Sequence, residues 1–300
     1  MPRDIHPSRA LLYAALLLHT FLSAATYLIA RRALTEIPPL PLGLFRFVLA
    51  GAVLALLLWR LLPPGRRLPP REQRRALWRL SFIAVPLNQG FFLIGLSLSS
   101  AGHAALLYSL TPVVVLLLSH APHGREIAGA ALALGGTLWV LLQRGAGAGA
   151  PVLGDALLAL AVLAWALYMT GARRFVAEHG ALPTTAWSLI GGTALFLPIG
   201  LAALAPAPAR AQIASASAGA WLGLVYLALA TSVIAYLLYY WALGKLAPVQ
   251  VAVFSNLQPL ATALLAHFTL GEQITPRFVA GAVIVMAGVV LTQSAKGAAP

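Results

Sequence analysis

HAALLYSLTPVVVLLLSH, residues 103–120, returns later in the chain as QVAVFSNLQPLATALLAH, residues 250–267. Each version is an apolar run of helix length, with a polar cluster one turn before an internal proline. A gap-free alignment superimposes Phe91 on Leu238, Tyr108 on Ser255, Ser109 on Asn256, Pro112 on Pro259 and His120 on His267. Because a structural unit that occurs twice constrains every other assignment, this repeat fixes the architecture first.

The repeat extends over most of the chain. At a second offset the front parts of the two copies also match, with Glu36 over Glu178. Residues 10–144 and 152–293 are therefore predicted to be two copies of one unit. The segment between them, RGAGAGAPVLGD (144–155), is rich in Gly and Ala, which is typical of a linker.

The composition indicates a membrane protein. Of the 300 residues, 60% are hydrophobic and only 9% are charged, whereas a soluble protein carries roughly a quarter charged residues. The acidic residues lie at or near the ends of apolar runs, or outside them. We therefore predict an all-α polytopic membrane protein that is surrounded by the lipid bilayer.

The formal charge of +13 and the absence of cysteine limit the expected partners. A basic chain can bind nucleic acid, but basic residues of membrane proteins collect in cytoplasmic loops, so no nucleic-acid partner is expected. Without cysteine, disulfides and thiolate metal sites are excluded. We expect a monomer that uses neither a metal nor a cofactor.

Ten apolar segments are long enough to cross a bilayer, which takes about 20 predominantly apolar residues. In chain order they are Leu11–Ala30, Leu40–Leu62, Leu80–Leu98, His103–His120, Ile127–Leu142, Ala156–Ala172, Leu182–Leu204, Ala220–Leu243, Val249–Leu270 and Phe278–Gln293. Five helices per unit is an odd number, so the second unit enters the membrane from the opposite side. The prediction is ten transmembrane helices arranged as two inverted five-helix repeats, a design common among secondary transporters.

The basic residues predict the orientation. If the N-terminus is cytoplasmic, most of the 20 Lys and Arg residues lie inside, which is the usual bias. The loop Arg60–Arg79 supplies the largest share. We therefore expect both termini, this loop and the loop Arg173–Glu178 to be cytoplasmic.

Polar residues within the first and third helices are candidates for a substrate site. His19, Ser23 and Tyr27 follow at intervals of four residues and share one helix face. Asn88 and Gln89 are adjacent amides in mid-span, and Phe92 lies one turn further on. Because unpaired polar groups are costly in lipid, these side chains should face a cavity. The alternatives are hydrogen bonding between helices and, for the amides, satisfaction of the backbone that Pro86 interrupts.

The polar clusters before the two internal prolines are further candidates. A proline within a helix frees a carbonyl group and permits a kink, and neighbouring side chains can bind the freed group or a ligand. The alternative is that the kinks only shape the helices. The substrate-binding candidates from these clusters are Tyr108, Ser109 and Asn256.

Aromatic residues concentrate in the sixth and eighth helices. Trp165 and Tyr236 lie deeper than the others. Tyr168 follows Trp165 at a spacing of three residues, and Tyr240 shares a helix face with Tyr236. Aromatic residues of membrane helices often form belts at the interface, but these positions favour a cavity wall that suits an amphiphilic substrate.

Arg46 lies in the second helix, about 9 Å from its outer end by helix rise. We expect its side chain to snorkel to the interface. The alternative is that it attracts an anionic group.

The order of motifs in the second unit is YYWAL (239–243), SNLQP (255–259), LGEQ (270–273) and GAVIVMAGVVL (281–291). This pattern resembles the paired EamA domains of the drug/metabolite transporter superfamily, although the first unit has HGRE (123–126) in place of LGEQ. The chain is also similar to YddG-type amino-acid exporters of bacteria. The resemblance implies ten helices in a bacterial inner membrane, alternating access, and a central cavity lined mainly by helices one, three, four, six, eight and nine.

The expected function is a secondary transporter for small amphiphilic metabolites, above all neutral and aromatic amino acids, with export implied by the resemblance. The alternatives are a sugar-phosphate or nucleotide-sugar carrier, which would need cationic side chains in its cavity, and a drug exporter driven by a buried carboxylate. A membrane-embedded enzyme would need a nucleophile with a base, paired carboxylates or a metal cluster. No predicted span has paired acids, and histidines such as His103 lack carboxylate partners within a span, so no enzymatic activity is expected.

Overall fold

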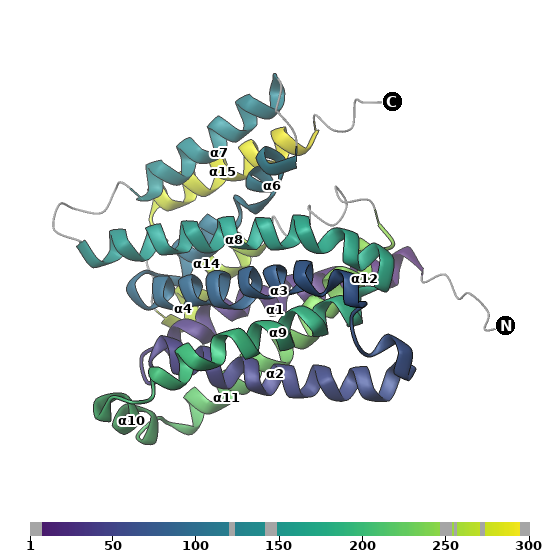
Figure 1. Ribbon diagram of the computed structural model, residues 1–300. Helices are drawn as coiled ribbons and strands as arrows, with labels where there is room; N and C mark the ends of the chain where they lie inside the picture. Colours follow the sequence, from purple (N-terminus) through teal and green to yellow (C-terminus); the bar gives the residue numbers. More distant parts are fainter. Residues whose placement is uncertain are drawn as a thin grey trace.

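The computed structural model describes residues 8–119, 124–141, 149–246, 254, 257–270 and 274–294, and every regular element within them is a helix (Figure 1). The helices of the first half are α1 (Arg9–Ala33), α2 (Pro39–Leu61), the short η1 (Pro64–Arg66) and η2 (Arg71–Gln73), α3 (Arg74–Phe82), η3 (Ile83–Leu87), α4 (Asn88–Leu98), α5 (Ala101–Tyr108), α6 (Thr111–Ser119) and α7 (Arg125–Leu141). Those of the second half are α8 (Gly149–His179), α9 (Ala181–Ala202), α10 (Ala207–Ala214), α11 (Ala218–Tyr226), η4 (Leu227–Ala235), α12 (Tyr236–Leu243), α14 (Gln258–Leu270) and α15 (Pro276–Ser294).

The chain is a multi-pass membrane protein. Seven helical stretches are long and apolar enough to span a bilayer: 9–33, 39–61, 64–98, 101–118, 152–179, 181–202 and 218–242. They overlap seven of the ten predicted spans, and the third stretch, 64–98, begins well before the predicted Leu80. The other three predicted spans also contain helices, namely α7, α14 and α15, but their described apolar parts are shorter. Large apolar side chains such as Phe21 and Leu222 are exposed, as lipid-facing residues are.

The long helices lie roughly side by side (Figure 1). Helices α7 and α15 form the upper edge of the bundle in this view, and α2 and α11 form the lower edge. Helix α1 begins and α15 ends at the right of the picture, whereas α10 lies at the left. Two large groups of buried apolar side chains hold the bundle together, and both contain residues from the two halves of the chain.

Helices α4 and α8 come into backbone contact at two glycines. A Cβ atom on Gly95 would lie 2.8 Å from the carbonyl oxygen of Gly154, and one on Gly154 would lie 2.9 Å from the carbonyl oxygen of Gly95. Small residues permit such close approach between membrane helices. The pair therefore sets the distance between a helix of the first half and one of the second.

A π-helical segment interrupts the third long helix of each half. In the first half it is η3, between α3 and α4, and in the second it is η4, between α11 and α12. The register that aligns Phe91 with Leu238 places η3 over residues 230–234, which lie within η4. Pro86 accounts for η3, because a proline has no N–H to donate to the helix ladder. Such π-helical insertions often occur at functional sites.

The structure shows a helix break at a proline where a kink was expected, and it corrects two predicted boundaries. The fourth span is interrupted between Tyr108 and Thr111, just before Pro112. The loop predicted at Arg173–Glu178 is wrong, because α8 continues to His179 and ends where Gly180 adopts a φ of 89°. The linker predicted at 144–155 is also too long, since α8 already begins at Gly149.

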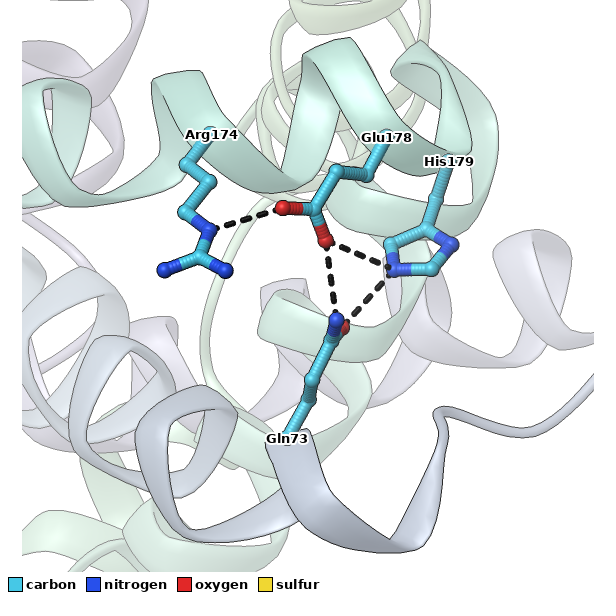
Figure 2. Close-up of polar contacts among 4 residues, drawn as sticks. All are labelled: Gln73, Arg174, Glu178 and His179. Atoms are coloured by element: carbon cyan, nitrogen blue, oxygen red, sulfur yellow. Dashed lines mark hydrogen bonds and ion pairs between the residues drawn. The ribbon is translucent and has the colours of Figure 1, made fainter.

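At one end of the bundle, Glu178 joins the two halves. Its carboxylate accepts hydrogen bonds from Gln73 at 2.8 Å and from Arg174 at 2.7 Å, and His179 contacts the Gln73 side-chain oxygen at 2.7 Å (Figure 2). Gln73 directly precedes α3, so Glu178 holds the start of the third long helix of the other half.

Glu36 makes the corresponding contact at the start of α11. Its carboxylate accepts hydrogen bonds from the backbone N–H of Ser217 at 2.6 Å and from the Ser217 hydroxyl at 3.0 Å. Ser217 is the N-cap of α11. The two glutamates that the repeat aligns therefore make equivalent contacts, each with the opposite half.

Candidate functional site

The polar centre of the bundle begins with the amides of Asn88 and Gln89 on the first turn of α4. Asn88 is fully buried and donates hydrogen bonds to the Tyr108 hydroxyl at 3.0 Å and to the Ala161 carbonyl at 2.8 Å. Gln89 in turn donates to the Asn88 side-chain oxygen at 2.5 Å. The Asn88 amide is therefore hydrogen-bonded to α5 and α8. Within the described chain it does not serve the backbone that Pro86 interrupts, which was the alternative prediction.

Arg46 joins this centre from α2. Its side chain is only 1% exposed, so the expectation that it snorkels to the interface is wrong. Its Nε donates to the Ser232 hydroxyl at 3.0 Å, and its Nη1 donates to the Gln89 side-chain oxygen at 3.1 Å. Buried polar partners on α4 and η4 make the inward position stable, whereas an outward position would leave those partners unpaired.

Three aromatic rings from α1, α4 and α5 pack edge to face beside the amides. The ring centroids of Tyr27 and Phe92 lie 6.0 Å apart, those of Tyr27 and Tyr108 lie 5.8 Å apart, and those of Phe92 and Tyr108 lie 5.6 Å apart. All three residues were site candidates from the sequence. The structure brings them together in geometry that aromatic pairs prefer.

A second aromatic group comes from α8 and α12. The Trp165 ring lies 5.3 Å from that of Tyr236 and 5.5 Å from that of Tyr168. Tyr236 is within electrostatic range of Tyr27, Tyr108 and Arg46. The two aromatic groups therefore flank one polar centre that both halves of the chain supply.

Three hydroxyls are buried beyond this centre, between α8, α9 and α12. The side chains of Tyr168, Ser188 and Tyr240 lie close enough to interact. Within the part of the chain that the structure describes, none of these three hydroxyls completes a hydrogen bond of ordinary geometry. The same holds for the hydroxyls of Thr184 and Thr185, which precede Ser188 on α9. Tyr168 and Tyr240 were site candidates, but they belong to this hydroxyl cluster rather than to the amide centre.

His19 connects helices at a different level of α1. Its Nδ1 lies 3.0 Å from the Ala235 carbonyl oxygen, and its Nε2 lies 3.4 Å from the Gln258 side-chain nitrogen. Because a carbonyl oxygen can only accept, Nδ1 carries the proton and Nε2 is the acceptor. This neutral tautomer satisfies both ring nitrogens, which fits the alternative of hydrogen bonding between helices.

Three other candidates do not join the polar centre within the described chain. Ser23 is half-buried and makes no side-chain hydrogen bond there. The Ser109 hydroxyl donates to the Leu106 carbonyl of its own helix at 2.6 Å. Asn256 lies outside the described residues.

Two contributors from η4 were not among the site residues predicted from the sequence. Ser232 orients Arg46, and the Thr231 hydroxyl lies 2.8 Å from that of Thr26 on α1. The available signal was a Thr-Ser pair in the middle of the apolar run 227–235. Its partners lie far away in sequence, which is why a local pattern gave it no role.

One histidine has a carboxylate partner that the sequence did not predict. His103 Nδ1 lies 3.3 Å from Asp155 Oδ2, and the Ser99 hydroxyl donates to Asp155 Oδ1 at 2.5 Å. These residues lie where the α4–α5 connection meets the start of α8. Within the described residues no group of three His or acidic side chains is arranged to hold a metal ion.

Comparison with known proteins identifies the class. The model of the EamA-like transporter family matches residues 10–142 and again residues 152–293. An uncharacterized transporter of Archaeoglobus fulgidus is 26% identical over 90% of this chain and 92% of its own length. The uncharacterized transporter YyaM of Bacillus subtilis is 26% identical (93% and 92% covered), and protein PecM of Dickeya dadantii is 27% identical (89% and 87% covered). A solved crystal structure shares the fold, with a TM-score of 0.66 and 20% identity over 95% of this chain and 96% of the other.

Proposed function

We propose that this chain, which belongs to the EamA-like transporter family, exports small amphiphilic metabolites, above all neutral and aromatic amino acids. The route is alternating access through the polar centre between the two halves. The observation that carries the proposal is the composition of this centre, in which paired amides and a buried arginine are flanked by two groups of aromatic rings.

The chemistry of an amino acid suits these groups. A carboxylate needs hydrogen-bond donors and an ammonium group needs acceptors, and amides and hydroxyls supply both. The rings of Trp165, Tyr236 and Phe92 can cover an apolar side chain. Because the donors and the rings come from both halves, a relative movement of the halves would change the access to a molecule held between them.

Several features support an inverted repeat of ten helices. The π-helical segments η3 and η4 occupy matching positions, and the aligned residues Glu36 and Glu178 make equivalent contacts. In the proposed orientation, both termini and the Glu178 contact are cytoplasmic, the Glu36 contact is on the outer face, and the protein acts as a monomer in a bacterial inner membrane.

The proposed energy source is the gradient of the substrate itself. A histidine such as His19 could couple transport to protons, but both of its ring nitrogens are engaged in the neutral form. Transport should therefore persist without a pH gradient. Strict dependence on an imposed proton gradient, retained in His19→Ala, would contradict this energy source.

A carrier of phosphorylated sugars is the second candidate. The sequence did not favour a sugar-phosphate carrier, because Arg46 was expected to snorkel to the interface and no other cationic side chain was expected in the central cavity. Buried Arg46 removes that objection, since arginine binds phosphate and carboxylate alike.

The test is counterflow in proteoliposomes across a panel of amino acids, sugars, sugar phosphates and nucleotides. We expect exchange of phenylalanine and other neutral amino acids, and loss of that exchange in Trp165→Ala. The matched control is Trp139→Ala, because Trp139 on α7 is exposed on the outside of the bundle. Exchange of sugar phosphates without competition from any amino acid would reject the proposal in favour of the second candidate.

A further inference from the structure

Arg46 is a buried cation that has no acidic partner among the described residues. Among the described residues the ion pairs are His103–Asp155, Arg174–Glu178 and His179–Glu178, so none involves Arg46. Its guanidinium group has five N–H donors. Ser232 and Gln89 accept two of them, and the other three, all on the terminal nitrogens, have no partner within the described chain.

Neutral acceptors alone compensate such a charge incompletely. Arginine stays protonated in proteins, and a buried charge is costly unless it is paired and hydrogen-bonded. The Cζ atom of Arg46 also lies 4.9 Å from the ring centroid of Phe47, and the hydroxyls of Tyr236 and Tyr108 are within electrostatic range. The ring and the hydroxyls are uncharged. The site therefore has one full positive charge and spare donors, which is what an anion requires.

The hydrogen bonds around Arg46 fix the direction of every group. The Ala161 carbonyl can only accept, so Asn88 presents its nitrogen to it and its oxygen to Gln89. Gln89 consequently presents its own oxygen to Arg46. This chain of donors and acceptors locks the guanidinium plane.

The same bonds leave the Tyr108 proton available. Asn88 donates to the Tyr108 oxygen, so that oxygen acts as an acceptor there. Its O–H donates to nothing within the described chain and lies within electrostatic range of Arg46. A ligand can therefore receive donors from Arg46 and Tyr108 together.

We propose that the terminal nitrogens of Arg46 and the Tyr108 hydroxyl form a receptor for the carboxylate group of the transported molecule. Gln89 and Ser232 are positioning residues that hold the guanidinium fork. The inference rests on the proposed function and deepens it, because it makes the carboxylate the obligatory part of the substrate. The aromatic rings serve the remainder of the molecule, and the ammonium group of an amino acid becomes dispensable.

The test is competition against labelled phenylalanine in proteoliposomes. Phenylalanine and 3-phenylpropionate carry a carboxylate, whereas phenylalaninamide and phenethylamine do not. Charge-assisted hydrogen bonds contribute about 1.5–3 kcal/mol, so the two compounds without a carboxylate should compete roughly tenfold to a hundredfold more weakly. Equal competition by phenylalaninamide and phenylalanine would overturn the inference.

Variants separate binding from folding. Arg46→Gln should abolish the preference for carboxylates, whereas the control Arg31→Gln, at the end of α1, should keep it. Because Arg46→Gln can fail to fold, Tyr108→Phe provides a second test that leaves the guanidinium and its partners in place. It should weaken competition by 3-phenylpropionate several-fold and leave that by phenethylamine unchanged. An unchanged carboxylate preference in folded Arg46→Gln, or in Tyr108→Phe, would contradict the receptor.

A binding readout distinguishes this inference from the proposed function. The probes are 3-phenylpropionate and glucose 6-phosphate, and the measurement is the melting temperature of the purified protein. If phenylalanine is not transported but 3-phenylpropionate stabilises the wild type and not Arg46→Gln, the amino-acid assignment fails and the carboxylate receptor stands. Stabilisation by glucose 6-phosphate but not by 3-phenylpropionate would overturn the carboxylate receptor in favour of a phosphate site. If phenylalanine is transported and phenylalaninamide competes equally, the receptor fails and the transport function stands.

Discussion

The close contact between α4 and α8 at Gly95 and Gly154 predicts that a larger residue there lowers the stability of the protein and also disturbs the polar centre. In Gly154→Ala, the new Cβ atom would lie 2.9 Å from both the Gly95 carbonyl oxygen and the Leu98 Cβ atom. The helices must therefore move apart. The hydrogen bond between Asn88 and the Ala161 carbonyl, 2.8 Å long, joins the same two helices about two turns away, so the movement reaches the amide centre.

The magnitude follows from two opposing terms. Overpacking of a well-packed contact costs typically about 1–3 kcal/mol, whereas replacing Gly by Ala within a helix stabilises by up to about 1 kcal/mol. Gly135→Ala on α7 is the matched control, because a Cβ atom there meets nothing within 4 Å. The difference between the two variants should therefore equal the overpacking cost.

The assay is thermal unfolding in detergent, followed by the fluorescence of the seven tryptophans. We expect Gly154→Ala to melt below Gly135→Ala by roughly 2–10 °C, given about 2–4 °C for each kcal/mol in a domain of somewhat smaller size. Gly95→Ala should lower the melting temperature less in the Gly154→Ala background than in the wild type, since the first substitution has already separated the helices. If Gly154→Ala is as stable as Gly135→Ala, the α4–α8 contact does not limit the distance between the halves.

Three further predictions concern the polar centre, one end of the bundle and the orientation. Asn88→Ala removes the donors to Tyr108 and to the Ala161 carbonyl and should lower stability by about 1–2 kcal/mol; a melting temperature equal to that of the wild type would show that these bonds contribute nothing. The backbone N–H of Ser217, and then its hydroxyl, hold the pKa of Glu36 below its ordinary value of 4.5. The contact therefore stabilises the protein above that value and is lost as the pH falls through the lowered pKa, and Glu36→Gln should remove this part of the acid dependence of the melting temperature. A cysteine introduced at Pro70, in this chain without native cysteine, should react with an impermeant reagent only from the cytoplasmic side, and labelling on intact cells would reverse the orientation.

Helix content and the positions of most spans were predictable, because a membrane-spanning helix requires a long apolar run that is visible in the sequence. The ends of the helices were less predictable, because helices do not stop at the membrane surface. Helix α8 passes through Arg174 and Glu178, whose side chains pair four residues apart. It ends before Gly180, whose positive φ of 89° is a conformation that glycine adopts readily.

The candidate site was only partly predictable, for a physical reason. Position along a helix gives depth in the membrane, and polarity identifies residues that avoid lipid. Neither depth nor polarity identifies the helix that packs against a given residue. Tyr27 and Tyr108 were identified from these two properties and Phe92 from its place one turn after Asn88, and the structure brings the three together. Arg46 was misplaced because its partners, Gln89 and Ser232, are 43 and 186 residues away.

The hydroxyl cluster of Tyr168, Ser188 and Tyr240 leads to a prediction about the inner route. Unpaired hydroxyls in an apolar interior are unfavourable, so their presence is explained if another conformation of the transport cycle hydrates them. Ser188 lies at the start of the third turn of α9, about 12 Å by helix rise from Gly180 at the end that carries the Glu178 contact. Water would therefore enter from the side proposed to be cytoplasmic.

Cysteine accessibility tests this route. In inside-out vesicles during transport, Ser188→Cys should react with an impermeant thiol reagent. Thr193→Cys on the same helix is the control, because the Thr193 hydroxyl already donates to the Leu189 carbonyl at 2.7 Å and to the Phe47 carbonyl at 3.1 Å, so no hydration is needed to satisfy it. Substrate should change the rate at Ser188→Cys, since binding redistributes the conformations. If both cysteines stay unreactive during turnover, or react equally, the cluster is a static part of the core and the inner route lies elsewhere.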